Sequence, residues 1–328
     1  MKKLFYLVIA FLFSPITEGQ VYKHDNPFAH TFSIVARDSV TGEMGVAVQS
    51  HWFSVGTVVS WAEAGVGAIA TQSFVNKSFG IRGLELLKKG LTAQQVLDTL
   101  LNKDAGREVR QVAIIDSKGN VATHTGKGCI QYATQIQGNQ FSVQSNMMLD
   151  DQVSIAMDEA FRKSAGKSLA ERLLVSLEAA QKVGGDIRGQ QSAAIIVVPA
   201  RSEGNPWDER TVDLRVDDDK EAIKELRRLY NVHLAYEHMN KGDFAIEKNK
   251  MTEAMNEYNV AMKMLPDNLE MQYWTAVTLA NNKNVKKAIP IFKKVFAKDK
   301  NWKELTKRLP DTRLLTVKKA DLKKILAL

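Results

Sequence analysis

Residues 31–50, TFSIVARDSVTGEMGVAVQS, limit the folds open to this chain more than any other stretch. In both halves of it the side chains alternate with a period of two, and apolar residues occur in both phases. This pattern predicts two strands whose faces are each at least partly covered. Residues 38–43 between them are turn formers, with Gly42 able to adopt positive φ. A hydroxyl residue, Thr31, begins the first strand, so the stretch predicts a buried strand pair with a polar residue at its N-terminal end.

The elements that follow alternate between strands and paired helices. Apolar runs at 56–61 and 66–71 predict buried strands, and strands are also expected at 109–116, 121–125, 141–145, 192–198 and 211–216. Helix pairs are expected at 80–89 with 92–102, and at 151–164 with 168–183. This order is typical of two stacked sheets with paired helices on both outer faces. We therefore predict an α+β fold, a four-layer αββα sandwich over residues 31–216.

From residue 220 to 328 the chain is expected to be helical with an internal repeat. Ala254, Tyr258 and Ala261 recur 34 residues later as Ala288, Phe292 and Val295. A period of about 34 residues is that of tetratricopeptide repeats, which are helix-turn-helix units. Two units fall below the three or so usually needed for independent stability, so this small all-α domain should dock on the first domain or on another subunit. Pro290 should bend the later helix or mark a late start.

The net charge is concentrated in this C-terminal part. The 328 residues carry a formal charge of +8, and residues 220–328 hold 23 Lys and Arg against 13 Asp and Glu, so residues 1–219 are close to neutral at −2. Lysines on helices most often form a solvated face, and we favour that reading over binding of nucleic acid or another polyanion. Apolar content of 45% and charged content of 25% are those of an ordinary globular protein.

The N-terminus predicts export. Two lysines precede an apolar run from residue 4 to 13, which is too short to span a bilayer and typical of a cleaved signal peptide. We expect the signal peptide at 1–19 and a leader or pro-segment at 20–30, with the mature protein periplasmic or extracellular in a bacterium. A single cysteine, Cys129, excludes an intrachain disulfide.

Several segments, in order, closely resemble the bacterial and archaeal family known as domain of unknown function 1028. They are HTFSIVARDSVTGEMGVAVQS, WAEAGVGAIATQSF, GIRGLELLKKGL, GREVRQVAIIDSKGNVATHTG, VQSNMM and GGDIRGQQSAAIIVV, which together cover about residues 31–198. That family looks like the N-terminal nucleophile (Ntn) hydrolases, whose fold is an αββα sandwich. The resemblance implies that Thr31 attacks an amide carbonyl and that its own α-amine acts as base. Thr31 takes this role only if the bond between His30 and Thr31 is cut.

Other residues are candidates for the same site. Asn146 and backbone N–H groups at 184–189 could stabilise an oxyanion, although Asn146 could equally cap a turn and the glycines could end a helix. Candidate binding residues follow the second strand or lie in the turn before residue 192, where loop anchoring competes as an explanation: Ser50, His51, Asp186, Arg188 and Ser192. The lysine that proteasome subunits keep near the nucleophile has no counterpart after the second strand, so that arrangement is not carried over.

Rival chemistries have weaker support. Cys129 lies near His124 in the sequence, but a lone cysteine in apolar surroundings is usually buried and inert. The chain has no Gly-x-Ser-x-Gly elbow, no HExxH motif and no Walker A or dinucleotide fingerprint. We therefore expect neither a metal nor a cofactor.

Two functions remain open. The first is an exported Ntn-type amidohydrolase that cleaves a C–N bond in a small-molecule amide or a peptide. Its helical tail would recruit a protein partner or complete a homo-oligomer. The second is a non-catalytic Ntn-fold protein that serves as a binding or scaffold module of the cell envelope.

Overall fold

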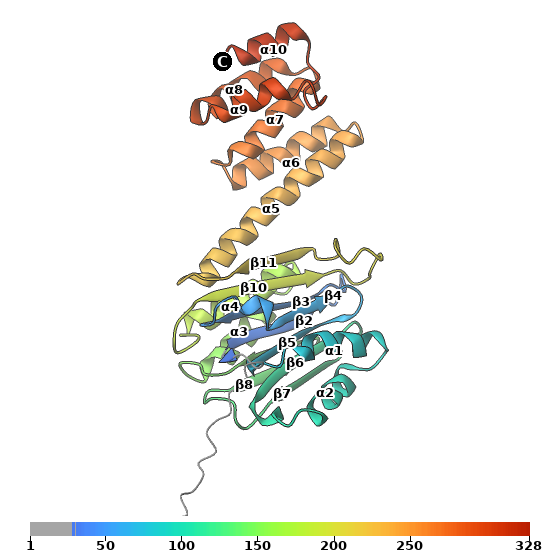
Figure 1. Ribbon diagram of the computed structural model, residues 1–328, viewed down its shortest axis with the longest axis vertical. Coiled ribbons are helices and arrows are strands. Elements are labelled where there is room, and N and C mark those ends of the chain that lie inside the picture. The colour runs from blue at the N-terminus through green and yellow to red at the C-terminus, as the bar shows by residue number, and fades with distance from the viewer. Residues whose placement is uncertain (1–27, 30) are drawn as a thin grey trace, which may run out of the picture.

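The computed structural model describes residues 28–29 and 31–328, and it consists of a layered α+β region below an all-helical region (Figure 1). The predicted signal peptide at 1–19 lies outside the described residues. So does the predicted leader at 20–30, apart from Phe28 and Ala29.

The layered region contains two antiparallel sheets. In the first sheet the spatial order is β1 (Phe28–Ala29), β5 (Gly67–Phe74), β6 (Arg110–Asp116) and β7 (Val121–Thr125), with β4 (Ser60–Glu63) also paired to β5. In the second the order is β11 (Val212–Val216), β10 (Ser192–Val198), β3 (Met44–Ser50), β2 (Thr31–Arg37), β9 (Phe141–Ser145) and β8 (Thr134–Gly138). The predicted strand pair therefore occupies the centre of the second sheet.

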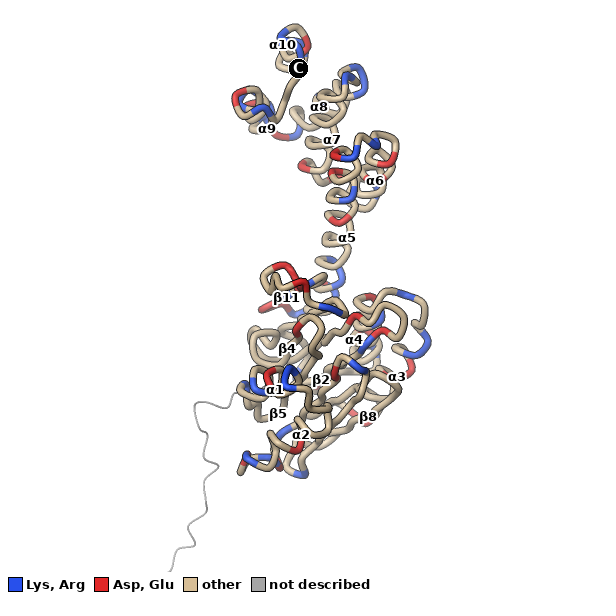
Figure 2. The backbone as a smooth tube through the Cα atoms, turned by 90° about the vertical axis from the view of Figure 1, so that its right-hand side faces the viewer, with Lys and Arg blue, Asp and Glu red and all other residues tan. Residues whose placement is uncertain are grey.

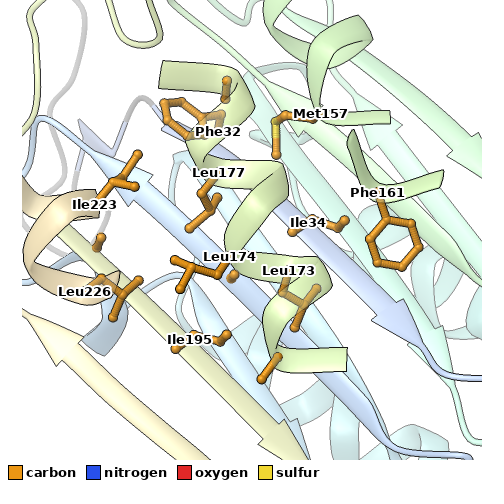
Figure 3. Close-up of a cluster of buried hydrophobic side chains, with 14 of the residues drawn as sticks. Phe32, Ile34, Met157, Phe161, Leu173, Leu174, Leu177, Ile195, Ile223 and Leu226 are labelled. Carbon is orange, nitrogen blue, oxygen red and sulfur yellow. The ribbon is translucent and has the colours of Figure 1, made fainter. Parts of the chain in front are cut away.

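Helices cover the outer face of each sheet. α1 (Ser78–Lys88) and α2 (Ala93–Asn102) pack on the first sheet around a shared apolar core. α3 (Gln152–Lys163) and α4 (Leu169–Lys182) pack on the second, where leucines of α4 meet the outward side chains of β2 and β10 (Figure 3). A third apolar cluster lies between the two sheets. The mixed α+β class is confirmed, and the layers run helices, sheet, sheet, helices.

Local sequence signals explain several element ends. Thr92 caps α2 in a capping box with Gln95, and the Ser168 hydroxyl accepts the Glu171 N–H at the start of α4. In the turn between β2 and β3, Asp38 accepts hydrogen bonds from the N–H groups of Val40 and Thr41. These residues place the starts of α2 and α4 and the end of β2 within a residue or two of the predicted bounds.

Two segments differ from the prediction. The segment predicted as a strand from residue 56 begins instead with a short 3₁₀ helix, η1 (Val55–Thr57), and the strand β4 starts only at Ser60. Edge strand β8 was not predicted, because its sequence TQIQG is mostly polar and only partly buried. Apolar content alone therefore misplaced one strand and missed another. A second 3₁₀ helix, η2 (Arg107–Val109), precedes β6.

The long helix α5 (Ala222–Glu247) joins the two regions. Its first turns belong to the layered core, where Ile223, Leu226 and Tyr230 are buried. Arg227 reaches back to α4, and its guanidinium donates to Glu178 at 2.7 Å and also to Glu171. The start of the helical tail is thus fixed on the layered region, while the rest of α5 runs away from it (Figure 1).

Five further helices form the tail: α6 (Met251–Met264), α7 (Leu269–Asn281), α8 (Val285–Lys298), α9 (Asn301–Arg308) and α10 (Lys319–Leu326). The repeated positions on α6 and α8 are all buried in the tail's apolar clusters. Pro290 lies inside α8, which begins five residues earlier, so it does not mark a late start.

Basic and acidic positions are interspersed along the tail (Figure 2), and several form pairs one helical turn apart, such as Lys307 with Glu304. This arrangement suits a solvated surface. None of the helices among the described residues combines the length and the apolarity needed to span a bilayer.

Candidate functional site

A row of polar side chains crosses one end of the second sheet. Ser192, Ser50 and Thr31 lie opposite one another in β10, β3 and β2. Asn146 comes next, one residue after β9 ends at Ser145. All four side chains are fully buried, at 0% exposure. The structure therefore brings together four of the seven residues that the sequence nominated.

This row lies on the face of the second sheet that is turned toward the first. Successive side chains in a strand point to opposite faces. Thr31 therefore shares the face of Val35, and Ser50 shares the face of Val48, both of which belong to the cluster between the sheets. The next row on this face, one step farther from Thr31, consists of Ala194, Val48, Ser33 and Gln144. The third row consists of Ile196, Val46, Val35 and Ser142. The layer between the sheets thus changes from polar to apolar along its length.

The first sheet presents matching polar side chains that the sequence reasoning missed. Gln72 in β5, Gln111 in β6 and Thr125 in β7 lie in one register row, and both glutamines are fully buried. The Gln72 side-chain amide donates to the Thr31 carbonyl at 3.2 Å and to Gln111 Oε1 at 2.7 Å. On the other side Gln72 Oε1 accepts a hydrogen bond from the Ser33 hydroxyl at 2.6 Å. Hydrogen bonds therefore cross between the sheets beside Thr31.

Three donors converge on the carbonyl oxygen of Thr31. They are the Asn146 backbone N–H at 3.0 Å, Gln72 Nε2 at 3.2 Å and Asn146 Nδ2 at 3.4 Å. A buried carbonyl needs only one partner to avoid a desolvation penalty. The peptide unit after Thr31 is therefore held more firmly than its burial requires.

Asp186, Arg188 and His51 meet at the same end of the sheet. The buried Asp186 carboxylate accepts from Arg188 Nε at 3.0 Å, Arg188 Nη2 at 2.7 Å and the His51 N–H at 3.2 Å. Asp186 also forms a β-bridge with Met148, which lies two residues beyond Asn146. The Asp186 carboxylate thus holds the loop after β3 and its own loop before β10 through charge-assisted hydrogen bonds, and the backbone bridge adds the segment after β9.

Within the loop 184–189 most backbone N–H groups already have partners. The N–H of Gly184 donates to the Gln181 carbonyl, and that of Ile187 donates to the Met147 carbonyl. Within the turn, the N–H of Arg188 donates to the Asp186 carboxylate and that of Gly189 to the Asp186 carbonyl. Gly184 and Gly185 both have positive φ, at 117° and 64°, which suits glycine and shapes the turn after α4. The loop therefore positions Asp186 through its own hydrogen bonds.

Ser192 holds the segment that follows β3. Its hydroxyl donates to the Trp52 carbonyl and accepts the Val55 N–H at 3.0 Å. Nδ1 of His51 in that segment is buried and has no hydrogen-bond partner among the described residues. The segment 51–57 is thus anchored to β10 beside the polar row.

Cys129 and His124 are not part of this constellation. The Cys129 thiol donates to the Arg110 carbonyl at 3.4 Å, and burial raises the pKa of the thiol, which disfavours the reactive thiolate. His124 lies opposite Val112, on the face of the first sheet that packs against helices. No group of three or more potential metal-ligating side chains occurs within residues 28–29 and 31–328.

The chain passes from one sheet to the other directly before Thr31. Phe28 and Ala29 pair with Phe74 and Ser73 in the first sheet, and Thr31 begins β2 in the second. His30, between them, lies outside the described residues. In the uncleaved chain Thr31 is therefore a buried internal residue of the crossing, and its nitrogen is an amide.

One sequence signal could have pointed to Gln72, although not to Gln111, which is followed by Val112. The dipeptide Gln-Ser occurs at 49–50, 72–73, 144–145 and 191–192, each time at or beside the end of an otherwise apolar strand. Buried strands rarely end in the same polar pair by packing alone, because each buried amide needs partners. The recurrence marks the ends of strands that meet at the polar row.

These features define an α+β protein with two stacked antiparallel sheets between helices and a buried polar site at one end of the layer between the sheets. The chain belongs to the family of unknown function DUF1028, whose model matches residues 31–226. The match covers more than half of the chain and ends inside α5, at Leu226. The family predicted from the sequence motifs is confirmed.

Two solved structures illustrate what the chain resembles. Protein SPO2555 from Silicibacter pomeroyi, of the same family, is 30% identical, with a TM-score of 0.55 over 61% of this chain and 84% of that one. Anbu, an ancestral β-subunit from Yersinia bercovieri, is 11% identical, with a TM-score of 0.31 over 61% of this chain and 93% of its own. No curated protein matches the chain. The Ntn type of the sandwich and the tetratricopeptide character of the tail stay predictions.

Proposed function

We propose that this protein is an exported Ntn-type amidohydrolase in which Thr31, exposed as the N-terminal residue by cleavage after His30, attacks the carbonyl carbon of an amide. The observation that carries the proposal is the position of Thr31. It heads a central strand, and Ser50, Asn146, Gln72 and Gln111 surround it in a buried polar end of the layer between the sheets. Burying so many polar groups has no packing advantage, which points to a chemical purpose.

The chemistry requires only the groups of the chain itself. The Thr31 hydroxyl would form a C–O bond to the substrate carbonyl carbon while its proton passes to the α-amine of the same residue. An α-amine has a pKa of about 7.7 to 8.0, so a useful fraction is neutral near pH 7. When the C–N bond breaks, the leaving amine takes that proton, and a threonyl ester remains. Water activated by the neutral amine then hydrolyses the ester.

Asn146 is our candidate for the group that stabilises the oxyanion. Its side-chain nitrogen donates to Gln111 Oε1 at 2.8 Å and makes a long contact of 3.4 Å with the Thr31 carbonyl. The long contact is weak, and the backbone N–H of Asn146 continues to hold the same carbonyl at 3.0 Å. Exchanging it for a bond to a developing oxyanion therefore costs little.

The remaining nominated residues frame the site. We assign Asp186 and Ser192 to anchoring the loops that border Thr31, through their contacts with His51, Trp52 and Val55. His51, Ser50 and Arg188 are the candidates for contact with a small-molecule or peptide substrate. The helical tail would recruit a protein partner or complete a homo-oligomer, and the N-terminal segment would direct the protein to the periplasm or the exterior.

The experiment is to determine the mature N-terminus and then its reactivity. We expect intact mass and N-terminal sequencing of the exported full chain to show a species that begins at Thr31. A β-lactone probe should acylate that residue, as peptide mapping would show. Thr31→Ser should keep the adduct and Thr31→Ala should abolish it. A protein that begins only near Gln20 and takes up no probe would overturn the proposal.

A non-catalytic binding or scaffold role is the second candidate. The observation that favours it is the burial of Thr31 in the uncleaved chain, together with the pairing of Phe28 and Ala29 with β5 directly before it. If the bond after His30 stays intact, Thr31 is the first residue of a strand and has no α-amine. The N-terminal sequence therefore separates the two functions.

A further inference from the structure

The direction of the Gln111 side-chain amide is fixed by its surroundings. Gln111 Nε2 lies 2.9 Å from the Ser145 carbonyl oxygen and 3.2 Å from the Thr134 carbonyl oxygen. Carbonyl oxygens only accept hydrogen bonds, so the atom that faces them must be the NH₂ group. Gln111 Oε1 is consequently turned the opposite way, toward β5 and Asn146.

The direction of the Asn146 amide follows from that of Gln111. Asn146 Nδ2 lies 2.8 Å from Gln111 Oε1 and 3.4 Å from the Thr31 carbonyl oxygen. Both of these atoms are acceptors, so a flipped Asn146 would place its own oxygen against two oxygens in a buried site. The backbones of β8 and β9 thus orient Gln111, and Gln111 orients Asn146.

Gln72 reinforces the same arrangement from the neighbouring strand. Its Nε2 donates to Gln111 Oε1 at 2.7 Å, so this oxygen accepts two hydrogen bonds and has no reason to turn away. Thr125 adds a further contact to Gln111 Nε2 at 2.9 Å. Gln111 lies in the first sheet, whereas Thr31 and Asn146 belong to the second, so the interaction links the two sheets across the site.

We propose that Gln111 is a positioning residue that keeps the side-chain NH₂ group of Asn146 turned toward Thr31. The inference rests on the proposed function, because the purpose of this orientation is to present a donor to the oxyanion. Gln111 does not touch the reacting atoms and acts through Asn146. Its loss should leave the nucleophile in place but let the Asn146 amide turn, and the donor would then be lost for part of the time.

The test compares Gln111→Met with a matched control, Gln144→Met. Both replace a fully buried glutamine in the layer between the sheets. Gln144, however, bonds to Ser33 at 2.5 Å and Ser142 at 3.1 Å rather than to Asn146. In the full-length protein labelled with ¹⁵N-asparagine, the two side-chain NH₂ resonances of Asn146 report its hydrogen bond directly. We expect them to move upfield and to exchange faster with water in Gln111→Met, with only small changes in Gln144→Met.

The rate of β-lactone labelling at Thr31 provides the second measurement. We expect it to fall about 10- to 100-fold in Gln111→Met and less than about threefold in Gln144→Met. Unchanged Asn146 resonances in Gln111→Met, or equal labelling rates in the two variants, would overturn the inference. If the wild-type protein is not labelled at all, the proposed function fails while the resonances of Asn146 still decide whether Gln111 orients it.

Discussion

The two ends of the layer between the sheets are equally buried but chemically opposite. At one end Val46, Ile115 and Ile196 are at most 5% exposed and meet other apolar side chains. At the other end Gln72 and Gln111 are fully buried as well, yet they meet hydroxyl, amide and carbonyl groups. The same four strands of the second sheet run through both ends.

This difference distinguishes the residues that stabilise the fold from the polar residues whose burial adds little stability. Burying apolar surface is favourable by roughly 25 cal/mol per Å², whereas a buried amide with full hydrogen bonding contributes little net stability. A chain selected only for stability would therefore extend the apolar packing to the end of each strand. The polar end is the part of the layer whose composition stability does not explain.

The largest expected effect lies at the apolar end. Ile115→Ala removes a fully buried side chain that packs between the sheets, and we expect it to lower the free energy of unfolding by about 2–5 kcal/mol. Urea denaturation of the full chain measures this loss. Thr31 labelling in the folded protein should stay within about twofold of wild type, because the site lies at the opposite end of the layer.

A loss below about 1 kcal/mol would contradict the comparison, since it would mean that the apolar end can collapse around the cavity or contributes little. Slower labelling of Thr31 in the folded protein would contradict the comparison in a different way, because it would show that a cavity at the apolar end alters the polar end.

The sequence predicted the layers well because its signals for them are local. Period-two alternation located β2 and β3, and the helices expected from residues 92 and 168 begin directly after Thr92 and Ser168, whose hydroxyls cap α2 and α4. The strand expected from residue 56 was wrong in its first half, because a short apolar run fits a 3₁₀ turn as readily as a strand. The half-exposed β8 was missed because edge strands need no apolar pattern.

The candidate site was only partly predictable, since its partners come from different strands. Thr31, Ser50, Asn146 and Ser192 were nominated one at a time, and register alone placed them side by side. Gln72 was not nominated because its Gln-Ser pair indicates a site only when all four such pairs are compared, and Gln111 was not nominated because it belongs to no such pair. Their contribution depends on the facing of two sheets, which no local pattern encodes.

A smaller effect is expected at the border of the polar end. Ser192→Ala removes the hydroxyl that bonds the Trp52 carbonyl and the Val55 N–H, so we expect a loss of about 1–3 kcal/mol in the free energy of unfolding. Faster hydrogen exchange of the Val55 amide would report the local part of this loss. The control is Ser142→Ala, which removes an equally buried hydroxyl that donates to the Gln144 side chain rather than to the segment 51–57. Equal exchange at Val55 in both variants would show that Ser192 does not anchor η1.

The smallest expected effect is a loss of stability at low pH. It involves Asp217, whose carboxylate bonds to Ser54 in the same segment 51–57. The hydrogen bond from the Ser54 hydroxyl at 2.6 Å, followed by that from Arg215 at 2.7 Å, holds the pKa of Asp217 below its ordinary value of 3.8 even though burial opposes this. Because the folded pKa is the lower one, the stabilisation is complete above about pH 4 and is lost as the pH falls through the folded value. The carboxylate is 42% exposed, so solvent screening keeps the contribution below about 1 kcal/mol.

We expect hydrogen exchange of the Val55 amide to accelerate below about pH 4 in the wild type and to show a weaker acid dependence in Asp217→Asn. An identical acid dependence in both proteins would place the acid-sensitive group elsewhere and leave Ser192 as the sole tested anchor of η1.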